Sequence, residues 1–383
     1  MLAYVCGDVT YSEGCNDDLN KIVSSCLWWQ PKYSLTNALK EYSRVFFPQL
    51  DENDVCDAFF SMEQSWIGDP CNNPNIEKVL AYFNDFVKRS PQIYNNWRFQ
   101  MHYFRAIADA FIRRRYIREK SLEQTALSFF KAGALDETLN ICETPLPIDE
   151  KYLLSHLWEL GYLLFASIGM QLDVEHFKGV GAERGCVLNT IERPVSNLAW
   201  IANRIKYIKS LPKVLWKEEA NIISNRDTLA NGEFSHSFSI DGCNLVGGRK
   251  YQTYLDFRND EKNADGLYGN VNLRTLRGYD DWEIEANIDG LINNKEYILT
   301  AFYFKDLAGE LILSGNGKEF YRSDYGYGGE INESYNARFA QNRTVRQYLI
   351  PADIVENGRL KLKWSTNEHE HCVVLAEFFI KLK

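Results

Sequence analysis

The stretch NRDTLANGEFSHSFSI, residues 225–240, marks a change in the hydrophobic pattern of the chain. Before it, apolar residues recur at the three- and four-residue spacing of amphipathic helices. After it, Gly, Asn and Asp separate short segments in which apolar and polar residues alternate, which is typical of β-strands and their turns. The sequence therefore predicts an α+β protein, in which an all-α region is followed by a β-rich region.

The β-rich region contains eight segments with the alternating pattern of strands. They cover residues 234–240, 250–257, 282–288, 297–304, 310–313, 344–350, 359–364 and 373–382. Residues 293–295 and 356–358 have the Asn and Gly composition of tight turns. This number of short strands in one region predicts an antiparallel β-sandwich with a jelly-roll-like topology.

The all-α region shows helical periodicity from residue 16 to residue 225. Helices are predicted over residues 17–29, 35–47, 51–66, 75–88, 91–118, 135–142, 149–168, 196–210 and 212–225, with a further segment that begins at Ser121. The segment 149–168 is apolar nearly all round, so we expect it to be buried on most sides.

The beginning of the chain has a third character. Residues 2–10 form a short apolar segment, residues 11–14 read Tyr-Ser-Glu-Gly, and a helix begins at Asn16 or Asp17. A strand, an acidic loop and a helix in this order form the unit with which (β/α)₈ barrels place carboxylates. Since the rest of the sequence contains no more such units, we predict an incomplete barrel end over 1–15, an α-helical domain over 16–228 and a β-sandwich domain over 229–383.

Short motifs spread over most of the chain point to a family. They are YSEG at 11–14, DDLNK at 17–21, EYSRVFF at 41–47, NWRFQ at 96–100, RGCVL at 184–188 and NGRL at 357–360. Together they resemble the C-terminal region of large bacterial proteins related to α-glucuronidase-type glycoside hydrolases. The resemblance implies a barrel, a helical region and a β-sandwich, and this chain would hold only the last strand of the barrel together with the other two regions.

The resemblance therefore implies the C-terminal portion of a carbohydrate-active, glycoside hydrolase-like protein. Such a portion would support or complete a saccharide site, and it would be inactive unless joined to a catalytic barrel. Two alternatives stay open: a stand-alone carbohydrate-binding protein, or a structural interaction protein. The expected partners are a saccharide or glycan, and either the missing barrel portion or a second copy of the chain.

The carboxylates near the start of the chain are the main candidates for chemistry. Glycoside cleavage generally uses two carboxyl groups, one protonated and one ionised. Glu13 lies in the turn before the helix and is the candidate catalytic acid or base, while Tyr11, Asp17 and Asp18 are candidate substrate contacts. The alternative for the two aspartates is helix capping, because carboxylates bind the free N–H groups of a helix start.

Two further candidates for substrate binding lie elsewhere. Arg98 has the planar fork that suits a uronic-acid carboxylate, although a structural pair with Glu63 or Asp109 is the alternative. Tyr325 and Tyr327 flank glycines in a loop of the β-rich region, where their rings could stack on sugars. The alternative is that this loop packs its own rings onto the sandwich.

The sequence predicts no metal and no cofactor. The His-Glu-His triplet at 369–371 lacks the helical spacing of a zinc site, and the polar cluster at 260–266 reads more simply as a loop than as a calcium site. The motifs of nucleotide binding and serine hydrolysis are missing. Nine cysteines without a C-x-x-C pair indicate neither a zinc ribbon nor a compact disulfide framework.

Charge and hydropathy narrow the expected partners. The formal net charge of −9 argues against a nucleic-acid surface, which needs a basic face. No apolar run has the length of a membrane span, so no membrane partner is expected. The sequence leaves the localisation open: it shows no secretory leader, which favours the cytoplasm for the chain as written, and the periplasm or secretion stays an alternative if the sequence is truncated.

Overall fold

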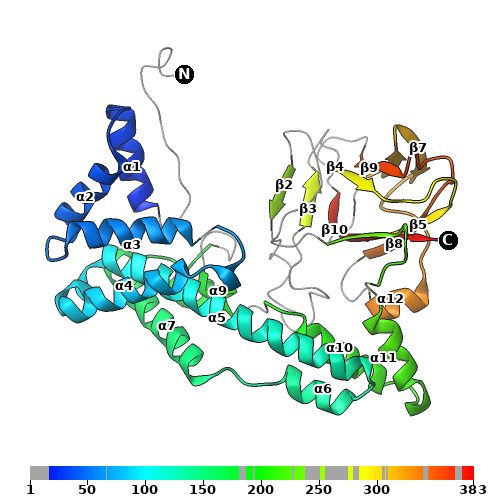
Figure 1. Ribbon diagram of the computed structural model, residues 1–383, viewed down its shortest axis with the longest axis horizontal. Coiled ribbons are helices and arrows are strands. Elements are labelled where there is room, and N and C mark those ends of the chain that lie inside the picture. The colour runs from blue at the N-terminus through cyan, green and yellow to red at the C-terminus, as the bar shows by residue number, and fades with distance from the viewer. Residues whose placement is uncertain are drawn as a thin grey trace. The chain divides into compact units, whose positions relative to one another are not determined.

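The computed structural model describes residues 17–65, 67–180, 187–192, 195–226, 228–237, 251–254, 275–278, 284–303, 307, 309–339, 344–366 and 373–383. Figure 1 labels their helices and strands, and it confirms the predicted class, a helical region followed by an antiparallel β-sandwich. None of the helices in these ranges combines the length and hydropathy needed to cross a bilayer.

By its internal contacts the chain divides into two compact units. The helical unit comprises Met1–Arg118 and Pro145–Arg193, and the sandwich unit comprises Glu119–Thr144 and Pro194–Lys383. The predicted domain boundary between residues 228 and 229 lies where helices give way to strands, whereas the compact units take several helices into the sandwich unit. Each unit has a hydrophobic core of its own.

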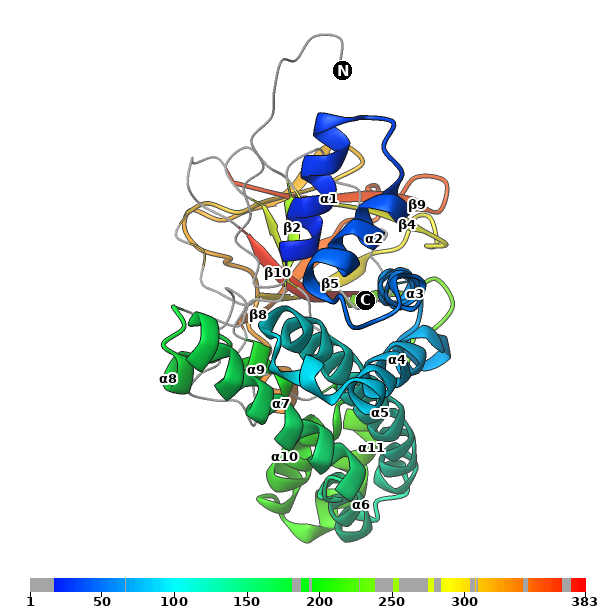
Figure 2. The same ribbon diagram turned by 90° about the vertical axis from the view of Figure 1, so that its left-hand side faces the viewer.

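The helical unit is built from helices and 3₁₀ turns. Its elements are α1 Asp18–Trp29, α2 Leu35–Phe46, α3 Glu52–Gln64, η2 Pro70–Asn72, α4 Asn75–Arg89, η3 Pro91–Asn95, α5 Trp97–Lys131 up to Arg118, α7 Ile148–Ile168, α8 Val174–Phe177 and α9 Val187–Ile191. Figures 1 and 2 show α1 beside α2 and α3 beside α4.

Local chemistry explains where these helices begin and end. Asp51 caps α3, because its carboxylate accepts hydrogen bonds from the N–H groups of Asn53 and Asp54. Gly169 ends α7 in the left-handed conformation, with a φ of 69°. The prediction of separate segments before Arg118 and after Ser121 is wrong. Residues 97–131 contain neither Gly nor Pro, and they form one helix of 35 residues.

The core of the helical unit is rich in aromatic rings from α2, α3, α4 and α5, such as Tyr42, Phe59 and Phe99. Helix α7 packs only one face into this core. The expectation that it is buried on most sides is therefore wrong, since Tyr152 is 69% and Tyr162 55% exposed.

The sandwich unit combines the end of α5 with further helices and all the strands. Its helical elements are α6 Leu135–Cys142, α10 Leu198–Lys209, η5 Lys213–Leu215, α11 Trp216–Ser224 and α12 Glu333–Phe339. Its strands are β1 Phe234–Ser237, β2 Tyr251–Tyr254, β3 Thr275–Gly278, β4 Ile284–Asp289, β5 Tyr297–Tyr303, β6 Ile312–Gly315, β7 Lys318–Arg322, β8 Thr344–Ile350, β9 Arg359–Ser365 and β10 Val374–Leu382.

The strands form two antiparallel sheets. One has the order β2-β3-β10-β5-β8, with β1 also paired to β10, and the other has the order β4-β9-β6-β7. Their inner faces share one core, in which Trp364 of β9 is fully buried and donates from Nε1 to the hydroxyl of Tyr303 on β5, 3.2 Å away. Strands β3 and β7 and helix α12 were not predicted from the sequence.

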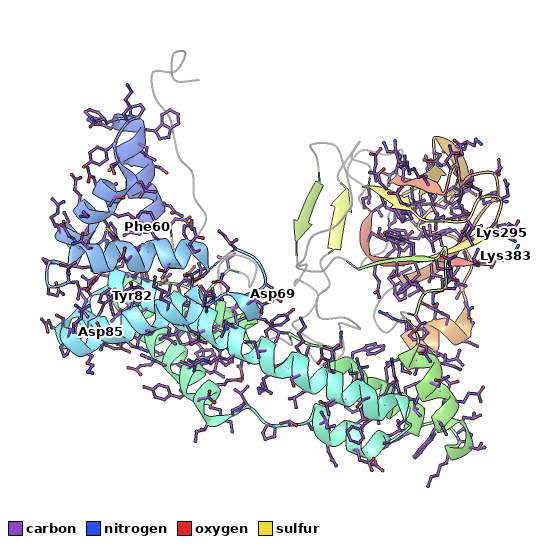
Figure 3. The ribbon with its side chains drawn as sticks, viewed as in Figure 1. Phe60, Asp69, Tyr82, Asp85, Lys295 and Lys383 are labelled. Atoms are coloured by element: carbon purple, nitrogen blue, oxygen red, sulfur yellow. The ribbon has the colours of Figure 1, made fainter. Side chains whose placement is uncertain are left out.

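One turn that the sequence predicted precedes β9, and an ion pair holds the C-terminal residue to the sandwich. Asn357 and Gly358 both have positive φ, as a tight turn before β9 requires. Figure 3 shows Lys295 and Lys383 at one end of the sandwich, where Nζ of Lys383 lies 2.9 Å from the carboxylate of Glu296.

The helices of the sandwich unit cover one face of the larger sheet. Side chains of α5, α6, α10 and α11 form a common core with Phe302 of β5 and Phe379 of β10. Inside this core Arg226 donates to both carboxylate oxygens of Glu377, at 3.0 and 3.2 Å. The side chains of the pair are 5% and 1% exposed, so the ion pair is fully desolvated.

Candidate functional site

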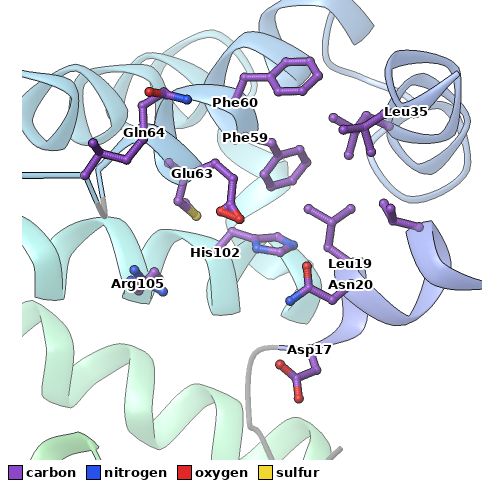
Figure 4. A pocket seen from close by; sticks show the side chains of 14 residues that line it. Asp17, Leu19, Asn20, Leu35, Phe59, Phe60, Glu63, Gln64, His102 and Arg105 are labelled. Atoms are coloured by element: carbon purple, nitrogen blue, oxygen red, sulfur yellow. The ribbon is translucent and has the colours of Figure 1, made fainter. Parts of the chain in front are cut away.

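An open pocket of about 850 Å³ lies on the helical unit, between α1, α2, α3 and α5 (Figure 4). It is lined by Asp17, Leu19, Asn20, Val23, Leu35, Leu39, Phe59, Phe60, Met62, Glu63, Gln64, Ile67, His102 and Arg105. It is the candidate functional site because Asp17, which the sequence marks for substrate contact, is one of its lining residues.

The pocket has an apolar side and a polar side. Leu19, Leu35 and Phe60 form the apolar side. Phe60 is 37% exposed, whereas phenylalanine is among the residues most often fully buried. Asn20 and Glu63 are among the polar lining residues, and Figure 4 shows both side chains directed toward the space around His102. A ligand that has both an apolar face and polar groups fits such a lining.

A buried hydrogen-bond network holds His102 at the pocket. Nε2 of His102 lies 3.1 Å from the hydroxyl of Tyr42, which donates to Asp18 at 2.9 Å. Nε of Arg98 donates to the same oxygen of Asp18, also at 2.9 Å. The guanidinium of Arg98 lies 3.9 Å from the ring centroid of Phe46, so the network ends in a cation–π contact.

The protonation states in this network result from its geometry. Asp18, paired with Arg98, can only accept, so Tyr42 must donate to it. The oxygen of Tyr42 then accepts from His102, and the proton of the imidazole is on Nε2. Burial lowers the pKa of His102 to about 4, and burial together with Asp18 raises the pKa of Tyr42. His102 is therefore a neutral imidazole at pH 7.

The structure separates the candidate residues of the chain start. Asp17 lines the pocket, and its carboxylate makes no capping hydrogen bond, so the capping alternative is wrong for it. Asp18 is held by Arg98 and Tyr42 and does not line the pocket. Tyr11 and Glu13 lie outside the described residues.

Arg98 does have an acidic partner, but neither of those that the sequence suggested. It pairs with Asp18 rather than with Glu63 or Asp109. Asp109 instead pairs with Arg105 one turn earlier on α5, with Nε and Oδ2 2.7 Å apart. Arg98 is not among the pocket-lining residues, so its predicted contact with a substrate carboxylate has no support from this pocket.

Sequence reasoning gave no site role to Tyr42 or Phe60, and it noted His102 only as a polar neighbour of Arg98 on one long helix. His102 lies four residues after Arg98 on α5, a spacing that puts both on one face of the helix. Tyr42 is 60 residues away on α2, and nothing in the sequence links it to His102.

The glycine-rich loop of the sandwich unit presents one of its two candidate tyrosines. Tyr325 is 73% exposed, whereas Tyr327 is 4% exposed. The ring of Tyr327 stacks on Tyr303, with centroids 3.6 Å apart and planes 8° apart, and Tyr348 donates its hydroxyl proton to the carbonyl of Tyr327. The expectation of an outward-facing ring is therefore wrong for Tyr327, because the loop packs this ring into the core.

Hydrogen bonds fix the loop that carries Tyr325. Ser323 accepts from the N–H of Leu311 at 2.8 Å and donates to the carbonyl of Gly326. Gly329 donates its N–H to the hydroxyl of Tyr321. The loop is therefore ordered by contacts on both sides of Tyr325.

Replacement of Gly329 by Ala is expected to lower the free energy of unfolding of the sandwich unit by about 2 kcal/mol. Gly329 has a φ of +72°, and a Cβ there would lie 2.6 Å from Cε1 of Tyr348. Gly317→Ala is the matched control, since its φ is +81° but no atom lies within 4 Å of its Cβ. Urea denaturation of both variants measures the difference, and equal losses would contradict the steric explanation.

Among the described residues, no three His, Cys, Asp or Glu side chains gather as metal ligands. The polar cluster at 260–266 and the His-Glu-His triplet at 369–371 lie outside the described residues, so the structure does not place them.

Fold and site together define a chain with a pocketed helical unit and an antiparallel β-sandwich. No protein-family model matches the sequence, and no curated protein matches it. Solved structures give distant matches. A CBM35 domain from Paenibacillus barcinonensis is 12% identical, with a TM-score of 0.26, over 39% of this chain and 99% of that one. TmCBM61, solved with β-1,4-galactotriose, is 13% identical, with a TM-score of 0.24, over 38% and 92%.

A longer match covers most of the chain. A family GH115 4-O-methyl-α-glucuronidase with specificity for decorated arabinogalactans is 10% identical, with a TM-score of 0.26. The match covers 92% of this chain and 43% of the glucuronidase, so the chain spans less than half of that protein.

Proposed function

We propose that this chain is a saccharide-binding part of a carbohydrate-active protein, and that the pocket of the helical unit is its sugar site. The observation that carries the proposal is the lining of the pocket, in which the partly exposed Phe60 occurs together with Asn20, Glu63 and His102. A pyranose has an apolar C–H face that stacks on aromatic rings and hydroxyls at its edge that need polar partners.

The size and the rigidity of the pocket support the same proposal. Its volume of about 850 Å³ lies in the range of small-molecule sites. The floor of the pocket is fixed before a ligand binds. His102 is held by Tyr42, and Tyr42 is held by the pair of Asp18 and Arg98. A pocket floor that does not rearrange loses less conformational entropy when a ligand binds.

Phe60→Ala is expected to weaken saccharide binding about tenfold, because loss of one stacked ring costs on the order of 1 kcal/mol beyond its buried area. Calorimetric titration of the purified chain with neutral oligosaccharides measures the change. Phe129→Ala is the matched control, since Phe129 is 39% exposed and does not line the pocket. Saturable binding of equal strength in both variants would place the sugar elsewhere, and no binding of any saccharide would defeat the proposal.

The proposal includes no hydrolysis by the chain alone. Glycoside cleavage needs two carboxyl groups placed on the two sides of one bond. Asp17 and Glu63 bring two carboxylates to the pocket, but the resemblance implies that catalysis belongs to a barrel and not to the helical region, and Asp18 is engaged by Arg98 and Tyr42. Incubation with aryl glycosides should release no phenol, and turnover that Glu13→Gln abolishes would show the opposite.

A second candidate site for the same function is Tyr325. The observation that favours it is a 73% exposed ring on a loop ordered by hydrogen bonds. One stacked ring gives an affinity of about millimolar to high micromolar. In an NMR titration Tyr325→Ala should remove this binding, whereas Tyr152→Ala, a 69% exposed ring on the helical unit, should not.

A further inference from the structure

His102 brings a hydrogen-bond acceptor to the pocket. Nε2 is occupied by its bond to Tyr42, and among the described residues none donates to Nδ1. The side chain is 5% exposed and lines the pocket. Among the described residues, the fully enclosed polar atoms without a hydrogen-bond partner do not include Nδ1, so Nδ1 is not sealed inside the protein. Nδ1 is therefore reached from the pocket, and its lone pair calls for a ligand group that donates.

The charged groups around this acceptor are mostly negative. Asp17 and Glu63 line the pocket with two carboxylates. Arg105 is the lining residue with a positive charge in the described part of the chain, and Asp109 balances it at 2.7 Å. Arg98 could have bound an anion, but it is paired with Asp18 and stacked on Phe46.

We infer that the pocket selects its ligand through a hydroxyl donated to Nδ1 of His102, and that it takes a neutral sugar ring in preference to a uronic acid. This inference rests on the proposed function and specifies its ligand. A carboxylate offers only acceptor atoms. The lone pair of Nδ1 and the carboxylates of Asp17 and Glu63 would repel it, and Arg105, the lining group of opposite charge, already has Asp109 as its counter-ion.

Tyr42 acts as a positioning residue for this acceptor. Its hydroxyl fixes the proton of His102 on Nε2, because that hydroxyl is itself committed to Asp18. In Tyr42→Phe the imidazole would be free to carry its proton on either nitrogen, so Nδ1 would accept for only part of the time. We expect a several-fold weaker affinity for the neutral sugar and a smaller difference between the neutral sugar and its uronide.

Paired ligands test the inference in the unmodified chain. Methyl glucoside and methyl glucuronide differ only at C6, and so do the corresponding galactose compounds. At pH 7 the neutral member of a pair should bind at least about tenfold more tightly. If a uronide binds equally or more tightly, the inference fails while the proposed function stands. If neither the neutral nor the acidic sugars bind, the proposed function fails and the inference with it.

Two variants separate the acceptor from the rest of the ring. In His102→Gln the amide reaches the position of Nε2, where it can still donate to Tyr42, but no acceptor remains at Nδ1. In His102→Asn the shorter amide puts its oxygen near Nδ1. We expect about tenfold weaker binding of the neutral sugar by the Gln variant and most of the affinity in the Asn variant. The reverse order would overturn the inference.

The chain offers a matched control for these variants. His156 on α7 bonds through Nε2 to the hydroxyl of Tyr94 at 2.9 Å, and Tyr94 donates to Glu159 at 3.0 Å. This is the same arrangement outside the pocket, so His156→Gln should leave the affinity unchanged.

Should either His102 variant fail to fold, a nitrogen NMR spectrum of the unmodified chain decides the question. At pH 7 His102 should carry its proton on Nε2, and a saturating neutral sugar should shift the Nδ1 resonance. A proton on Nδ1, or an Nδ1 resonance unmoved at saturation, would overturn the inference.

Discussion

Replacement of Glu377 by Gln is expected to lower the free energy of unfolding of the sandwich unit by about 3–5 kcal/mol. The physical reason is the burial of its partner. Arg226 keeps its charge at any pH of interest, and its side chain is only 5% exposed. Without the carboxylate, this charge stays buried among Phe379 and Trp200, whose ring centroids lie 5.3 and 5.7 Å away. Urea denaturation of the full chain measures the loss.

Two controls test whether the buried charge is the cause. The double variant Arg226→Met with Glu377→Leu removes both charges, so it should recover most of the lost stability. Asp289→Asn breaks the exposed pair with Arg359, which is 78% exposed, and should leave the transition where it is. A Glu377→Gln protein that unfolds at the same urea concentration as the parent would contradict the explanation.

Acidification from pH 6.5 to pH 4 is expected to cost the helical unit about 3 kcal/mol through His102. Burial lowers the pKa of His102 to about 4, from an ordinary value of 6.5. Between these two values the unfolded chain binds a proton at this residue and the native chain does not. Above pH 6.5 neither state binds the proton, and the free energy of unfolding is undiminished. As the pH falls toward 4, protonation of the unfolded chain lowers this free energy.

The titratable and charged groups around His102 are Asp17 before α1, Asp18 on α1, Tyr42 on α2, Glu63 on α3, and Arg98 and Arg105 on α5. Because carboxylates also titrate in this range, the test compares the parent with His102→Gln at pH 7 and at pH 4. The variant should be the less sensitive of the two to acid, by about 3 kcal/mol. Equal sensitivity would show that the native state admits the proton without cost.

The fold class could be predicted because hydrophobic period is a local property of the sequence. The change after Asn225 separates helices from strands, and β8 has the predicted bounds Thr344–Ile350. Elements of four or five residues, such as β3 and β7, are too short for a period to stand out. The prediction divided the long helix α5 because Ser121 and the charged residues around it were interpreted as the start of a new helix. No Gly or Pro interrupts the helix there.

The site could be predicted only in part, because pockets depend on contacts between distant segments. Asp17 was selected because it follows a predicted strand and acidic loop, and it lines the pocket. The pairing of Arg98 with Asp18 joins residues 80 positions apart, and that of Tyr42 with His102 joins residues 60 apart. No local pattern announces such pairs. Tyr325 and Tyr327 are two residues apart in one loop, yet one is exposed and the other buried.

The division of α5 between the two compact units has a practical consequence for anyone who wishes to isolate one of them. The chain passes from one unit to the other between residues 118 and 119, 144 and 145, and 193 and 194. A fragment that begins at residue 229 would contain every strand, but it would uncover Phe302 and Phe379, against which the helices pack. A fragment from Pro194 would still lack the end of α5 and α6. No single cut yields either unit intact, and we expect an isolated sandwich to need residues 119–144 to cover Phe302 and Phe379.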